Sequence, residues 1–172
     1  ASPRAVQHSD SWEIDIPEFT LPIVSRPGVF SGKQLDIGTL FFLQQFDQLP
    51  PSKQIVDLAC GNGVLGIAAA QKLPAADLSF VDESHIAISC SRENWAQHQG
   101  TRSAGFMCSD GLEGYAGPRP DLVLCNPPFH QQHIVNEYYG HRLVRQAIKV
   151  TQPGGRLCLV ANRHLNYSDM LR

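Results

Sequence analysis

Short apolar runs and longer amphipathic segments alternate along this chain of 172 residues. Apolar runs rich in Val, Ile, Leu and Phe and bounded by turn residues predict strands, and apolar positions at helical spacing predict helices. Two strand-like pieces, 14–16 and 23–24, come first. The expected strands are then 54–59, 77–82, 105–109, 121–125 and 155–161, and the expected helices are 36–48, 64–72, 85–98 and 137–150. This order predicts an α/β fold with a doubly wound, Rossmann-like parallel sheet.

A glycine-rich turn joins the strand 54–59 to the helix 64–72. Gly61, Gly63 and Gly66 have the G-x-G-x-x-G spacing, which is weak evidence by itself for a nucleotide site. Such a turn lets a ligand approach the backbone closely, and the following helix N-terminus favours a negative group. Asp57 would face a pyrophosphate badly, but it suits the ammonium and sulfonium of S-adenosylmethionine. The alternative is that Asp57 only braces the amides of the turn.

Acidic residues close the next two strands. Asp82 and Glu83 end the strand 77–82, and Asp82 lies 21 residues after Gly61, where a ribose-binding acid is expected. Asp110 and Gly111 follow the strand 105–109, and Asp110 can accept a hydrogen bond from an adenine amino group. Ligands bind at the carboxyl ends of such strands. The sequence therefore predicts one cofactor site there, and a solvated acid at a strand end is the alternative for each residue.

The sequence Asn126-Pro127-Pro128-Phe129 follows the apolar run 122–125. Two consecutive prolines exclude a helix and stiffen an extended loop. The Asn126 side chain and the Pro127 carbonyl can accept hydrogen bonds from a planar amine, and Phe129 can stack on it. The alternative is a proline-rich turn with an apolar plug.

Together these motifs resemble the class I S-adenosylmethionine-dependent methyltransferases. Four further segments are similar to the ribosomal guanine-N2 methyltransferases. They are the His-Gln-Gln-His extension of the loop and the segments 27–31, 35–39 and 160–165. The large-subunit enzymes are the nearer match, and the small-subunit enzymes are their relatives. The resemblance covers the chain from about Trp12 onward. It implies direct transfer of a methyl group from S-adenosylmethionine to the exocyclic N2 of a guanine in 23S ribosomal RNA. The RNA substrate would be protein-free or not yet assembled into the subunit. The reaction would need no strong general base.

The resemblance also implies roles for individual residues. The catalytic set is Asn126, Pro127, Pro128 and Phe129. The cofactor-binding set is Asp57, Ala59, Gly61, Gly63, Asp82, Glu83, Asp110, Gly111, Asn126 and Thr39. No metal is expected, because His130 and His133 have no neighbouring Cys or Glu ligands in the sequence.

The family pattern extends beyond this chain on both sides. Its members carry an additional N-terminal domain, a degenerate copy of the methyltransferase fold, and their sheet continues past 162–165 into a final antiparallel pair. We therefore expect residues 1–11 to be a linker or a disordered start. Residues 12–172 are expected to be a catalytic domain whose sheet is truncated at its C-terminal end. The N-terminal domain would contribute to RNA binding.

Charge and composition narrow the partners and the compartment. The formal charge of −2 argues against a strong non-specific nucleic-acid binder, but residues 1–118 carry −6 and residues 119–172 carry +4. The basic end fits an approaching RNA strand, and a solvated helix face with Arg142, Arg145 and Lys149 is the alternative. Five cysteines without a C-x-x-C pair give no disulfide or zinc framework. No long apolar stretch or signal peptide is present in the sequence, so a cytoplasmic protein without a membrane partner is expected.

Several other functions stay open on the sequence. The same loop can serve a small-subunit guanine-N2, an adenine-N6 or a protein glutamine-N5 methyltransferase. An NAD-binding Rossmann domain is opposed by Asp57 and by the absence of a catalytic Lys or Tyr near the turn. A catalytically inactive RNA-binding module is opposed by the intact Asp57, Gly61, Gly63 and Asn126.

Overall fold

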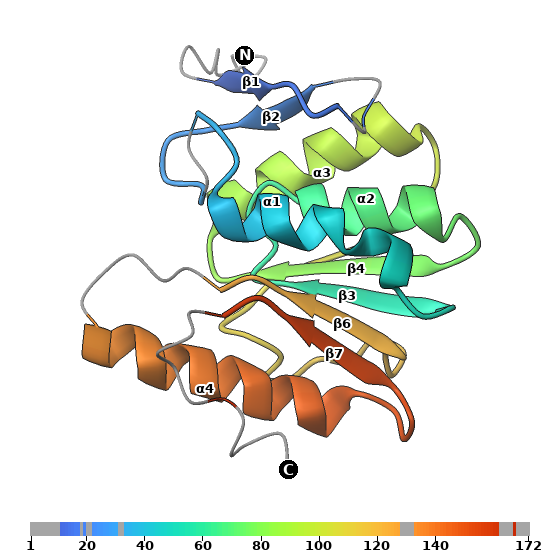
Figure 1. Ribbon diagram of the computed structural model, residues 1–172, viewed down its shortest axis with the longest axis vertical. Coiled ribbons are helices and arrows are strands. Elements are labelled where there is room, and N and C mark those ends of the chain that lie inside the picture. The colour runs from blue at the N-terminus through green and yellow to red at the C-terminus, as the bar shows by residue number, and fades with distance from the viewer. Residues whose placement is uncertain are drawn as a thin grey trace, which may run out of the picture.

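A five-stranded parallel sheet forms the centre of the protein (Figure 1). The structure, a computed structural model, describes residues 11–17, 19, 22–30, 33–127, 133–161 and 167, without the side chains of 133–137. The strands are β3 (Gln54–Leu58), β4 (Asp77–Asp82), β5 (Gly105–Cys108), β6 (Leu122–Cys125) and β7 (Arg156–Leu159), in the order β5-β4-β3-β6-β7. The order reverses between β3 and β6, so the expected doubly wound sheet is confirmed and its switch point lies between these two strands.

Helices cover both faces of this sheet (Figure 1). On one face lie α1 (Ile37–Gln44), the 3-10 turn η1 (Phe46–Gln48), α2 (Val64–Lys72) and α3 (His85–Gln99), and α4 (His133–Val150) lies on the other. An antiparallel hairpin of β1 (Trp12–Ile14) and β2 (Ile23–Ser25) packs outside α3.

Helices α1 and α4 differ from the prediction by more than one residue. The expected helix 36–48 is interrupted at Gln45, which places Phe46 edge-on against Phe42 with 5.7 Å between the ring centroids. Burial of Phe46 thus outweighs continuation of the helix. Helix α4 begins at residue 133 rather than 137, so it includes the β-branched residues Ile134 and Val135 despite their low helix propensity.

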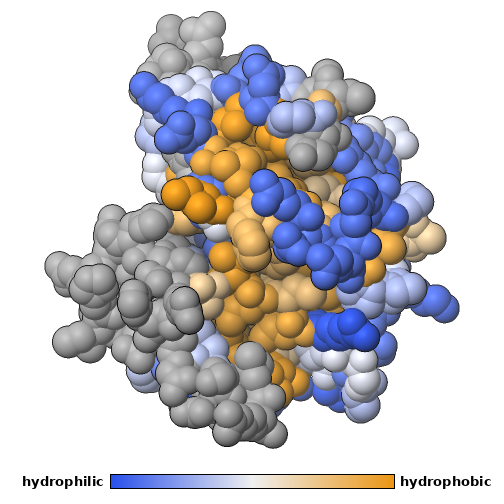
Figure 2. All heavy atoms as spheres, viewed as in Figure 1, coloured by the Kyte–Doolittle hydropathy of each residue, from blue (hydrophilic) through white to orange (hydrophobic). Residues whose placement is uncertain are grey.

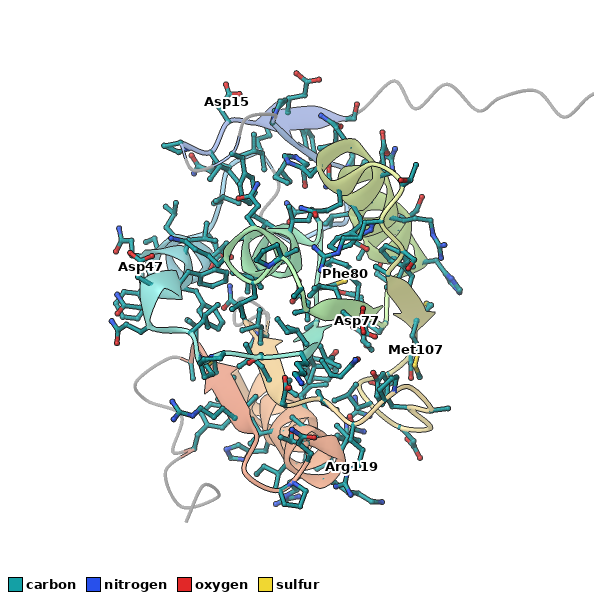
Figure 3. The ribbon with its side chains drawn as sticks, turned by 90° about the vertical axis from the view of Figure 1, so that its right-hand side faces the viewer. Asp15, Asp47, Asp77, Phe80, Met107 and Arg119 are labelled. Carbon is teal, nitrogen blue, oxygen red and sulfur yellow. The ribbon has the colours of Figure 1, made fainter. Side chains whose placement is uncertain are left out.

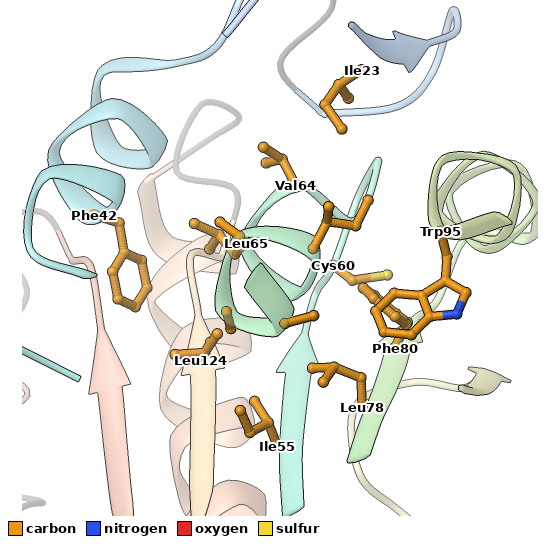
Figure 4. Close-up of a cluster of buried hydrophobic side chains, with 14 of the residues drawn as sticks. Ile23, Phe42, Ile55, Cys60, Val64, Leu65, Leu78, Phe80, Trp95 and Leu124 are labelled. Atoms are coloured by element: carbon orange, nitrogen blue, oxygen red, sulfur yellow. The ribbon is translucent and has the colours of Figure 1, made fainter. Parts of the chain in front are cut away.

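The sheet separates two apolar cores. Along β3, Ile55 packs in the cluster beneath α1, α2 and α3, whereas Val56 packs in the cluster beneath α4. Phe80 on β4 lies in the first cluster, between the sheet and the helices (Figures 3 and 4). Strands that are buried on both faces require the nearly continuous apolar runs that the sequence shows.

A buried asparagine ties the β1–β2 hairpin to the centre of the fold. The Asn94 Oδ1 accepts from the Val24 amide at 2.8 Å, and its Nδ2 donates to the Val24 carbonyl at 2.8 Å. The same Nδ2 also donates to the Asn62 carbonyl at 2.9 Å. One side chain therefore joins the hairpin to the turn that follows β3.

Apolar side chains reach the surface along α1 and β7 (Figure 2). Ile37 is 85% exposed and Phe41 is 56% exposed. Among the helices that the structure describes, none is long and apolar enough to cross a membrane.

Candidate active site

The turn after β3 has the backbone geometry of a close-approach site. Ala59, Gly61 and Gly63 all have positive φ, at 56°, 55° and 82°. A Cβ on Gly63 would lie 2.8 Å from the Cβ of Ser91, so only glycine fits at the start of α2. Ala59 is the one non-glycine residue with positive φ in the described part of the chain, and such strain is concentrated at functional sites.

Asp57 on β3 stabilises this turn through a hydrogen bond. Its Oδ2 accepts from the Gly66 amide in the first turn of α2 at 2.8 Å, a bond that is compatible with both interpretations of Asp57 from the sequence. The residue is 1% exposed, and its Oδ1 has no hydrogen-bond partner in the described protein. Burial raises the pKa of Asp57 from an ordinary 3.8 to about 8, and the nearby Asp82 carboxylate adds to the effect.

The raised pKa of Asp57 predicts a pH-dependent stability. Because the folded state holds the proton more tightly than the unfolded state, the free energy of unfolding should fall as pH rises from about 4 to 8. Asp57→Asn keeps an acceptor for the Gly66 amide but does not titrate. Its free energy of unfolding, relative to that of wild type, should therefore increase as pH rises through this window. Urea denaturation at pH 5 and pH 8 measures the difference. The same pH dependence in both proteins would contradict the assignment.

A cavity of about 490 Å³ opens beside the turn, at the carboxyl ends of β3 and β4. It is lined by Gly61, Asp82 and Glu83, three of the residues predicted to bind the cofactor, and by Tyr139 from α4. The Asp82 Oδ2 accepts from the Gly61 amide and its Oδ1 from the Ser84 amide, both at 2.9 Å. A carboxylate can accept about four hydrogen bonds, so Asp82 can still accept from ribose hydroxyls. Burial raises the pKa of Asp82 despite these two bonds.

A second, smaller hollow brings Asn126 to the same turn. Asn126 and Thr39 line this hollow with Ala59, Cys60 and Gly61. The Asn126 Nδ2 donates to the Thr39 hydroxyl at 2.9 Å, whereas its buried Oδ1 has no hydrogen-bond partner in the described protein. An acceptor without a partner therefore lies beside the glycine turn.

The structure places Asp110 and Gly111 outside the two hollows that contain most of the other predicted cofactor residues. Both oxygens of the Asp110 carboxylate bond the Arg142 guanidinium, so an adenine amino group would have to share this acceptor. Gly111 packs against α4, where a Cβ would lie 1.9 Å from the Gln146 Oε1. Neither residue lines the two hollows, and their cofactor roles stay predictions.

Part of the predicted loop lies outside the described residues. Pro127 is buried. Pro128, Phe129, His130 and the segment 162–165 fall outside the description, and so does the His133 side chain. Their predicted roles are untested.

Sequence reasoning missed two residues of the site. Tyr139 lines the larger cavity, and burial beside Glu83, Asp82 and Asp110 raises the pKa of its phenol. No signal in the sequence marks it, because its place depends on how α4 packs. Asp36 caps α1 and holds Thr39. An Asp three residues before Thr at a predicted helix start is an N-capping pattern that could have revealed it.

Comparison with known proteins identifies the family of this chain. Residues 20–172 match the methyltransferase small domain family. The chain belongs to this family. The ribosomal RNA large subunit methyltransferase G of Pseudomonas paraeruginosa is 44% identical to this methyltransferase domain over 161 residues. The match covers 94% of the chain and 42% of that relative, so the chain spans less than half of the length of the relative. The predicted resemblance is confirmed.

Solved structures agree with the family assignment at the level of fold. The ribosomal protein L11 methylase of Lactobacillus delbrueckii has a TM-score of 0.60 at 19% identity, covering 78% of this methyltransferase domain and 64% of that chain. A methyltransferase of Pyrococcus furiosus also has a TM-score of 0.60, at 15% identity, covering 78% and 66%. At these identities the likeness establishes the fold alone.

Proposed function

We propose that this methyltransferase domain transfers a methyl group from S-adenosylmethionine to the exocyclic N2 of a guanine in 23S ribosomal RNA. The observation that carries the proposal is the buried Asn126 Oδ1, an acceptor without a partner beside the glycine turn. Exocyclic amines donate hydrogen bonds, so this atom suits an amine target. Guanine in large-subunit RNA is favoured by the motifs of the chain and by the name of its 44% identical relative.

The residues around the larger cavity fit S-adenosylmethionine. Asp82 would accept from the ribose hydroxyls, with Glu83 beside it, and the backbone of Ala59, Gly61 and Gly63 would approach the methionine end. Asp57 would act on that end through the turn that it braces, and Thr39, Asp110, Gly111 and Asn126 complete the proposed set. The bound cofactor supplies a methyl group on a sulfonium, which is an excellent leaving group.

The chain's own residues would position the target amine. Asn126 and the Pro127 carbonyl would accept its two hydrogens, which aligns the nitrogen lone pair with the methyl donor. A guanine inside a helix cannot reach a buried amide, so the base has to leave its stack, and Phe129 would hold it by stacking. Alignment would account for most of the rate enhancement. The nitrogen that gains the methyl group would release one proton to solvent, and the sulfonium would leave as a neutral thioether, so no strong general base is needed.

The basic C-terminal part offers less surface to RNA than its formal charge indicates. Arg142 pairs with Asp110, and Arg119 donates to the carbonyls of Lys149, Val150 and Thr151 at the end of α4. Arg145 and Lys149 are exposed and can contact phosphates. We propose that the part of the longer relatives outside the match supplies further RNA contacts, and that residues 12–172 form the catalytic domain.

Methyl transfer to protein-free 23S RNA, followed by nucleoside analysis, tests the substrate. The full-length relative from P. paraeruginosa serves as a control for the quality of the RNA. We expect guanine methylated at N2 as the product of this chain. Methyladenine, methylated protein, or no transfer by a chain that binds S-adenosylmethionine would overturn the proposal. Calorimetry with S-adenosylmethionine and with NAD separates the cofactor classes, and binding of NAD alone would contradict the cofactor assignment.

Phe129→Ala separates base stacking from cofactor binding. Loss of a stacked base should weaken RNA binding by about 1–3 kcal/mol. The affinity for S-adenosylmethionine, measured by calorimetry, should stay near that of wild type. If cofactor binding is lost instead, Phe129 is an apolar plug and the stacking role is wrong.

A further inference from the structure

We propose that Asp36 and Thr39 are positioning residues that hold the side-chain amide of Asn126 with its oxygen toward the target amine. This inference rests on the proposed function and deepens it, because it assigns residues that decide what Asn126 can recognise. The three side chains come from the start of α1 and from the end of β6, so the sheet and its helix layer must fold before they meet.

The three side chains form a directed chain of hydrogen bonds. Asp36 caps α1, and its Oδ1 accepts from the amides of Gly38 at 2.9 Å and Thr39 at 3.2 Å. The Thr39 hydroxyl donates to the other oxygen, Oδ2, of the same carboxylate. The Asn126 Nδ2 then donates to the Thr39 hydroxyl oxygen at 2.9 Å. Thr39 is 3% exposed and Asn126 is 5% exposed, so water has little access to these bonds.

This network excludes the reversed orientation of the Asn126 amide. A hydroxyl has one proton, and Thr39 gives it to the Asp36 carboxylate, so Thr39 can only accept from Asn126. The Asn126 Nδ2 also lies 3.5 Å and 3.4 Å from the two Asp36 oxygens. A reversed amide would place its oxygen against three acceptor oxygens in a buried site, which is costly. The charge of Asp36 thus fixes that the Nδ2 of Asn126 is bonded to Thr39 and that the Oδ1 is the atom left without a partner in the described protein.

The fixed orientation has a consequence for specificity. Held this way, Asn126 presents an acceptor and no donor to its target. A group with an N–H, such as an exocyclic amine, is matched, whereas a keto oxygen would meet a second acceptor. Asp36 and Thr39 would therefore favour amines over carbonyl groups without touching the target themselves.

Nuclear magnetic resonance of the Asn126 side-chain amide tests this orientation without any substrate. Asn126→Asp, which lacks the NH₂ group, identifies its signals by their disappearance. Thr39→Val removes the hydroxyl and keeps nearly the same shape, so the NH₂ protons of Asn126 should exchange with water at least about tenfold faster. Thr39→Ser should restore the slow exchange. If Thr39→Val fails to fold, Asp36→Asn serves instead, because Asn also caps helices while it replaces one carboxylate oxygen by an NH₂ group and so removes both the charge and the acceptor for the Thr39 hydroxyl.

Kinetics supply the second measurement. Thr39→Val should lower kcat by about tenfold to a hundredfold, because alignment at the reacting nitrogen is lost, with a KM for RNA near wild type. Thr39→Ser should recover most of that loss. Thr151→Val is the matched control: the Thr151 hydroxyl donates to the Ala147 carbonyl at the end of α4, outside both hollows, so turnover should not change.

The two measurements separate the inference from the proposed function. Unchanged exchange of the Asn126 amide in a folded Thr39→Val protein would overturn the positioning role, whatever the activity. Equal loss of turnover with Val and Ser at position 39 would overturn it as well. If wild type transfers no methyl group to guanine while the amide exchange responds as expected, the proposed function fails and the positioning of Asn126 stands.

Discussion

Asn126→Ala should lower turnover by about a hundredfold or more while the affinity for S-adenosylmethionine changes little. The variant removes the acceptor that aligns the target amine, and misplacement by about 1 Å can cost that much in rate. Single-turnover methyl transfer with 23S RNA measures the chemical step, and calorimetry measures cofactor binding. Parallel losses in both would mean that Asn126 belongs to the cofactor site and has no separate role in alignment.

The companion variant Asn126→Asp should be partly tolerated, and the structure adds a pH dependence. A carboxylate at this position still accepts hydrogen bonds, but it would lie close to the Asp36 carboxylate, which is 3.4 Å from the present Nδ2. Like charges at this distance raise the pKa of one member, so a single shared proton keeps the geometry at lower pH. Residual turnover relative to wild type should therefore fall as pH rises. A flat ratio across pH would argue against contact with Asp36.

Phe80→Ala should lower the free energy of unfolding by about 3–5 kcal/mol, a large part of the 5–15 kcal/mol typical of a domain. The Phe80 ring is fully buried and stacks on Phe106 with 5.1 Å between centroids, while Trp95 packs edge-on at 5.4 Å. Gly66 in α2 lies so close that a Cβ there would be 2.3 Å from the Phe80 Cε1. Truncation leaves a cavity that these neighbours cannot all close.

Urea denaturation at constant pH measures this loss. Phe41→Ala is the matched control, since it removes the same atoms from a side chain that is 56% exposed. Its effect should stay within about 0.5 kcal/mol, as for most surface substitutions. A Phe80→Ala variant that loses no more than Phe41→Ala would show that the core repacks around the missing ring.

The order of elements was predictable from the sequence, because buried strands and amphipathic helices have different apolar periods. The bounds of β4 and α2 agree with the prediction at both ends. Tertiary packing decided the rest. The break between α1 and η1 depends on the burial of Phe46 against Phe42, and no local pattern at Gln45 announces it.

The candidate site residues that lie at the carboxyl ends of strands were predictable from the sequence. Asp82 and Asn126 each follow from the rule that ligands bind at the carboxyl ends of parallel strands, and both line a hollow in the structure. Contacts between distant helices were not predictable in this way. Asp110 is engaged by Arg142, and Tyr139 reaches the larger cavity, only because of how α4 packs on the sheet.

The buried side-chain amide of Asn94 links the N-terminal hairpin directly to the glycine turn of the candidate site. It satisfies both backbone groups of Val24 and also holds the carbonyl of Asn62, within the glycine turn. A shift of the hairpin that moved Asn94 would leave the buried carbonyl of Asn62 without its partner. The stability of the hairpin and that of the turn are therefore coupled. The chain from β2 to Phe30, which continues onto the cavity wall, is therefore anchored to the same turn that the cofactor would contact.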